Sequence, residues 1–256
     1  MNTTLRRDAD EIICSSIQAV LPDKAVCRAL EDFQPGGGRV LLVAAGKAAW
    51  QMAYAAVQTL GRVDGGVVVT KYGHVKGGIP GISCYEAGHP VPDEACVEGC
   101  KKIEALARDI TSRDLVFTIT GSGCGSLMTY PADDITIDEI ARFTHMMQIE
   151  KGVPTSDLNP IRTHIDRFKG GRLSRLFRPA TLVHMTTADP SKQNTPVTRT
   201  TYFEMLEHNT FFPPLSTGTT YADCIAILQK WNAWDKTPAS IQNRLLRGTP
   251  ETENMS

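Results

Sequence analysis

The amino-acid sequence predicts an α/β protein with a mostly parallel β-sheet and helices on both faces, a three-layer sandwich. Two observations favour this fold class. Short apolar runs recur along the chain, as in residues 39–45 and 114–120, and such runs are typical of strands buried on both faces. Segments of helix-forming composition lie between them. This alternation indicates parallel strands joined by right-handed crossovers.

The first half of the chain is expected to contain four strands. The Ala-rich segment 46–60 holds good helix formers throughout. The segment 92–110 begins with a proline and two acidic residues, which suit the start of a helix. The expected elements are, in order, helices 5–20 and 22–33, strand 39–45, helix 46–60, strands 65–70 and 81–87, helix 92–110 and strand 114–120.

The pattern is weaker in the second half. Segments 189–201 and 211–220 are polar and rich in turn-forming residues. We expect a single domain over residues 1–247 and a disordered tail over 248–256. The expected elements of this half are helices 136–150 and 157–168, strand 181–187, and helices 221–231 and 238–246.

Composition and charge argue against several classes of protein. The chain has 256 residues and a formal net charge of -1, which gives no electrostatic reason to bind nucleic acid or an anionic membrane. No apolar run approaches the roughly 18 residues needed to span a bilayer, and the N-terminus resembles an amphipathic helix more than a signal peptide. Seven cysteines without a C-x-x-C pair indicate reduced thiols. We therefore expect a cytoplasmic protein.

Two strand ends carry residues suited to bind phosphate. Gly46 and Lys47 follow strand 39–45 at the start of a helix, where N–H groups and a lysine attract anions. The loop GSGCGS (121–126) follows strand 114–120, and its glycines let backbone N–H groups approach an oxyanion. A surface lysine and a flexible turn are the plainer interpretations. Because open parallel sheets bind ligands at the carboxyl ends of their strands, we favour phosphate binding.

Neither turn matches a standard nucleotide motif. The sequence contains no Walker A loop, and the GSGCGS loop lacks the G-x-G-x-x-G spacing of dinucleotide-binding proteins. A third candidate is the basic cluster of Arg162, His164, Lys169 and Arg172, which suits a carboxylate or phosphate as well as it suits a solvated helix end. His89 lies in the turn after strand 81–87 and is interpreted as structural, because a lone histidine in a turn usually is.

Seven motifs occur in one order and together resemble the N-terminal domain of the glycerate 2-kinases. Members of that family transfer phosphate from ATP to the 2-hydroxyl of D-glycerate. The resemblance covers residues 5 to 247 and implies a Rossmann-like domain, over which a second, C-terminal domain closes to form the active-site cleft. The motifs are AAGKAAWQMA (44–53), TKYGH (70–74), EAGHPVPDE (86–94), SGCGS (122–126), IRTH (161–164), KGGRL (169–173) and TTYADCIAIL (219–228).

The resemblance implies ATP and Mg²⁺ as cofactors and gives roles to individual residues. Lys47 matches a lysine that is catalytic or stabilises phosphate. His164 and Asp189 are the candidates for the general base, and no metal ligand is named. The implied cofactor-binding residues are Gly46, Lys47, Ser122, Gly123, Gly125 and Ser126, and the implied substrate-binding residues are Arg162, Lys169 and Arg172.

Some positions depart from the family. Thr163 stands where lysine is usual, Cys124 replaces a glycine, and the S-D-V-x-G-D and S-G-P-T segments are not recognisable. The sequence ends where the second domain of the family would be expected to begin. Three hypotheses follow: a kinase of D-glycerate or a related small hydroxy acid whose second half is a separate polypeptide, a divergent enzyme acting on another sugar acid, and a non-catalytic ligand-binding or regulatory protein. A hydroxypyruvate oxidoreductase lacks support from any dinucleotide motif. The resemblance leaves a homo-oligomer open.

Overall fold

The computed structural model describes residues 3–187 and 212–248. Five parallel strands form one sheet in the order β3-β2-β1-β4-β5, so the predicted α/β fold class is confirmed. Each observed strand begins and ends within one residue of the predicted one. The strands are β1 (Val40–Ala45), β2 (Gly65–Lys71), β3 (Ile82–Ala87), β4 (Leu115–Thr120) and β5 (Thr181–Thr186).

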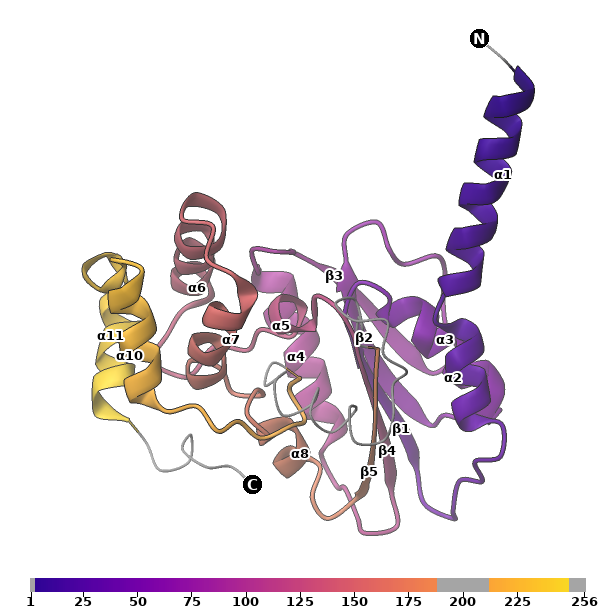
Figure 1. The fold of residues 1–256 in the computed structure, drawn as a ribbon. Helices are drawn as coiled ribbons and strands as arrows, with labels where there is room; N and C mark the ends of the chain where they lie inside the picture. The colour runs from indigo at the N-terminus through magenta and orange to yellow at the C-terminus, as the bar shows by residue number, and fades with distance from the viewer. Residues whose placement is uncertain (1–2, 188–211, 249–256) are drawn as a thin grey trace.

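Helices cover both faces of the sheet (Figure 1). On one face lie α2 (Asp23–Leu30) and α3 (Ala49–Leu60), and on the other lie α4 (Glu94–Leu106) and the short α5 (Cys124–Leu127). Every residue of β1 and β4 is buried, as continuous apolar strands between two helical layers must be. The expected start of α4 is borne out, because the Asp93 carboxylate accepts a hydrogen bond from the N–H of Cys96.

The order of the strands places two turns side by side. The chain runs from β1 outward to β2 and β3, then returns to the opposite side of β1 to form β4 and β5. Ala45 at the end of β1 pairs with Thr120 at the end of β4. In doubly wound sheets this reversal point leaves a crevice at the carboxyl ends of the two central strands, where ligands bind. Both glycine-bearing turns that the sequence analysis selected begin at this point.

A helical unit with its own hydrophobic core packs beside the sheet (Figure 1). The predicted helix 136–150 is divided into an α-helix and a π-helix, and the predicted helix 157–168 ends at His164. It ends early because the Asp166 carboxylate accepts hydrogen bonds from the N–H groups of Phe168 and Lys169, which turns the chain. The elements are α6 (Ile137–Thr144), π-helix η1 (His145–Glu150), α7 (Thr155–His164), α10 (Tyr221–Lys230), 3₁₀-helix η2 (Trp234–Lys236) and α11 (Ala239–Arg247); α8 (Arg172–Leu176) lies between this unit and the sheet.

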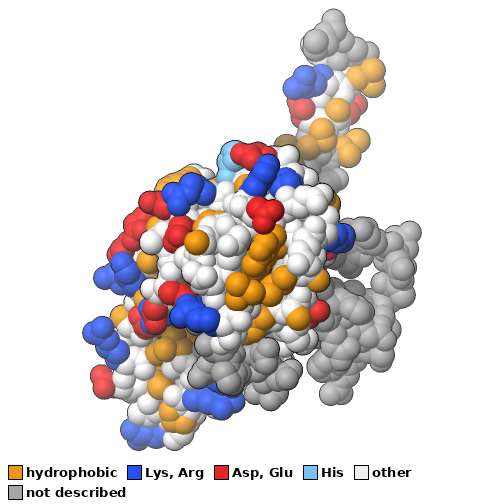
Figure 2. All heavy atoms as spheres, turned by 90° about the vertical axis from the view of Figure 1, so that its left-hand side faces the viewer, with side chains coloured by type: hydrophobic (Ala, Val, Ile, Leu, Met, Phe, Trp, Pro, Cys, Tyr) orange, Lys and Arg blue, Asp and Glu red, His pale blue; other side chains and the backbone are white. Residues whose placement is uncertain are grey.

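The first helix, α1 (Thr3–Val20), projects away from the body of the protein (Figure 1). No residue of α1 is buried, and its hydrophobic side chains lie exposed along the helix (Figure 2). Among the described residues, no helix combines the length and the apolar composition needed to span a bilayer. Residues 249–256 of the predicted disordered tail lie outside the described residues.

Candidate functional site

The turn after β1 is fixed by hydrogen bonds to both neighbouring strands. Gly46 donates from its N–H to Val69 of β2, and the buried hydroxyl of Thr70 donates to the carbonyl of Gly46. Lys47 donates from its N–H to the carbonyl of Ser122 across 2.9 Å. The helix that follows begins at Ala49, so Lys47 lies in the turn itself and its side chain is exposed. The turn therefore presents the lysine at the reversal point of the sheet.

Glycine is required where this turn meets the loop 121–126. Gly46 has a φ of +136°, and a Cβ atom there would lie 3.1 Å from the backbone of Gly121. Gly123 has a φ of +93°, and its Cβ would lie 3.0 Å from Nε2 of His89 and 3.2 Å from Cγ of Lys47. Only glycine adopts such conformations freely and allows this approach. The loop after β4, the lysine after β1 and the histidine after β3 thus meet around Gly123.

The loop has one exposed hydroxyl and one buried hydroxyl. Ser122 is exposed, and its N–H group and that of Gly123 form no hydrogen bond with another described residue. The side chain of Ser126 is buried, and its hydroxyl donates to the carbonyl of Pro90 across 2.7 Å. Ser126 thus holds the turn after β3 against the loop, whereas Ser122 and the adjacent backbone are available to an anion.

His89 stands in a positive environment. Burial, followed by the charges of Lys47 and Arg162, lowers the pKa of His89, and Lys71 and His74 contribute in the same direction. The imidazole is therefore neutral at pH 7 and can accept a proton. From the sequence, His89 was predicted to be structural. His89 follows the carboxyl end of β3, just as Lys47 and Gly123 follow β1 and β4. Because parallel strands end at the same edge of a sheet, this position in the sequence could have indicated a functional role.

Arg162 on α7 supplies a second cation to this edge of the sheet. Its side chain is 7% exposed, and burial lowers its pKa to about 10, so it remains charged at pH 7. Its guanidinium donates to the amide oxygen of Gln148 across 2.9 Å, and within the described ranges no carboxylate pairs with it. Gln148 lies on π-helix η1, a distortion that often occurs at functional sites. Asn159, one turn earlier on α7, faces Gly125 with its side-chain oxygen.

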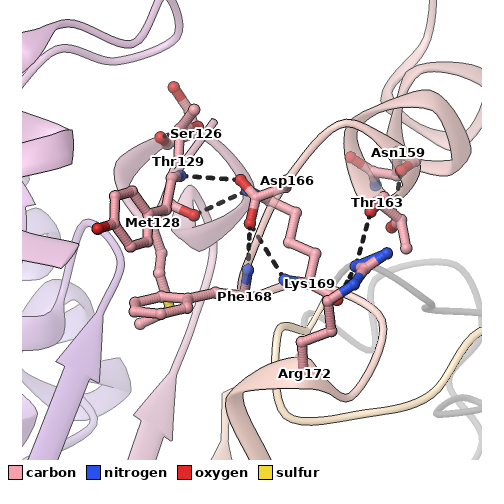
Figure 3. Close-up of polar contacts among 10 residues, drawn as sticks. Ser126, Met128, Thr129, Asn159, Thr163, Asp166, Phe168, Lys169 and Arg172 are labelled. Carbon is pink, nitrogen blue, oxygen red and sulfur yellow. Dashed lines mark hydrogen bonds and ion pairs between the residues drawn. The ribbon is translucent and has the colours of Figure 1, made fainter. Parts of the chain in front are cut away.

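Lys169 is held inside the protein, away from solvent. Its ammonium donates to the Asp166 carboxylate across 2.5 Å and to the carbonyl of Met128 across 2.7 Å (Figure 3). The Lys169 side chain is 2% exposed. These two contacts neutralise the ammonium group and satisfy its hydrogen bonding inside the protein, so that no bound ligand is needed. Lys169 was predicted to bind substrate. In this structure its side chain is buried and paired, away from the open edge of the sheet, and a substrate contact by Lys169 stays a prediction.

Two other predicted residues also make internal contacts. Arg172 donates to the backbone carbonyls of Thr163 and Lys169 (Figure 3). His164 is completely buried, its ring Nε2 lies 2.9 Å from the carbonyl of Thr219, and burial lowers its pKa to about 4. The ring is therefore enclosed by protein in this structure, and the general-base role of His164 stays a prediction. Asp189, the other candidate for that role, lies outside the described residues.

Known proteins resemble this chain over nearly its whole length. A family profile described as a domain of unknown function (DUF4147) matches residues 8–197. The chain belongs to this family. Among its relatives, a D-glycerate 2-kinase of Thermotoga maritima is 33% identical over 249 residues, which make up 97% of this chain and 56% of that protein. The predicted resemblance to the glycerate 2-kinases is thus confirmed.

A solved structure and a further relative are also similar to this chain. The crystal structure of a glycerate kinase from Thermotoga maritima has a TM-score of 0.76 and 32% identity, covering 98% of this chain and 57% of that one. A protein of Agrobacterium vitis whose name proposes a hydroxypyruvate reductase is 32% identical over 215 residues, 82% of this chain and 45% of that protein. This chain therefore spans about half the length of such relatives.

Proposed function

We propose that this chain is a glycerate kinase subunit that transfers the γ-phosphoryl group of ATP to a hydroxyl of D-glycerate or a related small hydroxy acid. The observation that carries the proposal is the meeting of Lys47, His89 and the loop 121–126 around Gly123. This cluster lies at the reversal point of the sheet, where doubly wound folds bind ligands. The similarity to a D-glycerate 2-kinase supports the same chemistry.

The cluster supplies what phosphoryl transfer requires. Catalysis of this reaction depends on positioning and on stabilising the charge of the phosphoryl oxygens. We assign that stabilisation to the ammonium of Lys47 and to the backbone N–H groups of Ser122 and Gly123, with Gly46 and Gly125 allowing close approach. His89 is neutral at pH 7 because burial and the nearby cations lower its pKa, and we assign it the proton of the attacking hydroxyl.

Arg162 is our candidate for binding the carboxylate of the acceptor. A buried guanidinium without an acidic partner is unfavourable unless an anion joins it. Gln148 is a neutral acceptor and orients the guanidinium without neutralising it. Because arginine binds a carboxylate in bidentate fashion, an incoming hydroxy acid would supply the missing charge. Arg162 also acts on His89 electrostatically, which supports an acceptor bound near the proposed base.

Magnesium is expected as a cofactor from the kinase resemblance. No group of three or more His, Cys, Asp or Glu side chains in residues 3–187 and 212–248 is arranged to hold a metal ion. We therefore assign no protein ligand to Mg²⁺ and no step to it.

Release of ADP by the purified chain tests the proposal directly. The chain is mixed with Mg-ATP and D-glycerate, alone and with a polypeptide that provides the second half found in the relatives. We expect phosphorylated glycerate in at least one mixture. Lys47→Ala should reduce turnover by orders of magnitude and keep the fold, because its side chain is exposed. Lys101→Ala on α4 is the matched control, since Lys101 is an exposed lysine paired with Glu98.

The outcomes separate the remaining functions. Near-normal turnover by Lys47→Ala would remove Lys47 from the mechanism. Ligand binding without turnover in either mixture would favour a non-catalytic binding protein, and turnover of another sugar acid would favour a divergent enzyme. The name of the Agrobacterium vitis relative makes hydroxypyruvate with a nicotinamide cofactor a further substrate pair to assay. Oxidation of that cofactor would contradict the kinase proposal.

A further inference from the structure

A cavity of about 290 Å³ opens beside Lys47, and no residue of α7 lines it. Its walls come from three segments: the link between α1 and α2, the start of α3, and the connection between β2 and β3. Leu21, Pro22 and Trp50 give it apolar surface. Ligand pockets commonly have volumes of roughly 300–1,000 Å³, so this cavity accommodates part of a nucleotide, such as the nucleoside, and not the whole of it.

The aromatic wall of the cavity is held in place. The indole N–H of Trp50 donates to the carbonyl of Gly77 across 2.9 Å. The ring also stacks on Tyr54, with centroids 5.3 Å apart and planes 11° from parallel. A ring fixed on two sides loses little entropy when a planar ligand packs against it. Aromatic side chains of this kind bind nucleic-acid bases by stacking.

Basic side chains line the same cavity. Lys47, His74 and Lys76 contribute to its walls, and none of its lining residues is acidic. The position of His74 is fixed, because its Nδ1 lies 2.8 Å from the carbonyl of Lys47. A planar apolar wall combined with basic side chains fits a ligand that is aromatic at one end and anionic at the other.

Lys47 connects this cavity with the candidate phosphate site. Its side chain lines the cavity and its Cγ lies next to Gly123 of the loop 121–126. We propose that the cavity binds the nucleoside of the phosphate donor, with the base against Trp50 and the phosphates passing Lys47 to reach the loop. This inference rests on the proposed function, because it presumes a nucleoside triphosphate as donor. The acceptor would then approach from the side of α7.

Binding of ADP, adenosine and inorganic tripolyphosphate to the full chain tests the inference. Calorimetry with the wild-type chain should detect ADP and tripolyphosphate, and the fluorescence of Trp50 should change with ADP and adenosine only. Trp50→Ala should weaken ADP binding about tenfold and leave tripolyphosphate binding within about twofold. Tyr54→Leu is the matched control, because Tyr54 supports Trp50 from outside the cavity and should change ADP affinity less.

Unchanged ADP affinity in a folded Trp50→Ala chain would overturn the inference. If that variant does not fold, Leu21→Glu takes its place under the same criterion, because a carboxylate in the cavity wall should repel ADP. Failure of the proposed function gives a different pattern. ADP binding that depends on Trp50, without transfer to any hydroxy acid, would support the cavity assignment and contradict the kinase. If Trp50→Ala transfers phosphate to D-glycerate with an unchanged KM for ATP, the kinase proposal is supported and the cavity assignment is contradicted.

Discussion

The ammonium of Lys169 and the carboxylate of Asp166 form a buried ion pair across 2.5 Å (Figure 3). Both side chains also form hydrogen bonds with the backbone. The Asp166 carboxylate accepts from the N–H groups of Tyr130 and Phe168, and the Lys169 ammonium donates to the carbonyl of Met128. These contacts tie the segment after the loop 121–126 to the segment after α7. The pair therefore fixes the position of the backbone that follows the loop 121–126.

Removing one member of this pair should destabilise the fold. Lys169→Met leaves the Asp166 carboxylate buried without a counter-charge, which costs about 3–5 kcal/mol of unfolding free energy. Urea unfolding followed by circular dichroism measures the change. Lys101→Met is the control, because its ion pair with Glu98 is exposed and such pairs contribute little. A Lys169→Met chain with wild-type stability and poor substrate binding would instead restore Lys169 as a ligand.

Arg162→Met should separate binding from stability. The substitution removes a buried charge that has no carboxylate partner among the described residues, so the free energy of unfolding should stay constant or rise. The KM for the hydroxy acid should increase by at least about 30-fold. Steady-state kinetics with varied acceptor, together with urea unfolding, distinguishes the two effects. Gln148→Ala should produce a smaller increase in KM, since Gln148 only orients the guanidinium. A large loss of stability would identify Arg162 as structural.

Gly123→Ala should impair the proposed site through contact and strain. Its Cβ would crowd Nε2 of His89 and the side chain of Lys47, and its φ of +93° disfavours alanine. We expect turnover to fall at least about tenfold. Gly61→Ala is a matched control: Gly61 has a φ of +66° but no atom within 4 Å of the added Cβ. Comparable activity loss in both variants would show that backbone strain alone is responsible.

Acid should destabilise the protein through His164. Burial lowers its pKa to about 4, whereas the unfolded chain takes up the proton near pH 6.5. Between these values only the unfolded state is protonated, so stability falls as the pH drops from 6.5 to 4 and is unaffected by His164 above 6.5. The full effect is about 3 kcal/mol. His164→Gln should flatten the dependence of the urea midpoint on pH.

His145→Gln, which replaces an exposed histidine on η1, is the control for this experiment. His184 behaves as His164 does, because burial lowers its pKa to about 4 as well. Some acid sensitivity should therefore persist in His164→Gln. An unchanged slope in that variant would mean that the folded and unfolded chains protonate His164 over the same pH range.

The sequence predicted those features that depend on local pattern. Apolar runs predicted β1, β2 and β4, because a strand buried between two helical layers is largely apolar. The edge strands β3 and β5 are partly exposed and contain polar residues, so their apolar pattern is weaker. The glycines of 46 and 121–126 marked the two turns, because backbone with positive φ or with a close neighbour requires glycine. The helix 136–150 was found as one element, but its π-helical second half has no signature in the spacing of its residues.

Only the tertiary structure determined which of these turns and side chains lie next to one another. Strand order joins the ends of β1 and β4 and brings His89 to Gly123, and pairing between strands distant in sequence leaves no local periodicity. The basic cluster shows the same limit. Arg162 and Lys169 lie seven positions apart, yet Lys169 is neutralised by Asp166 while Arg162 has only an amide partner. The energy of a buried charge depends on what faces it across the core, and that is a property of the folded chain.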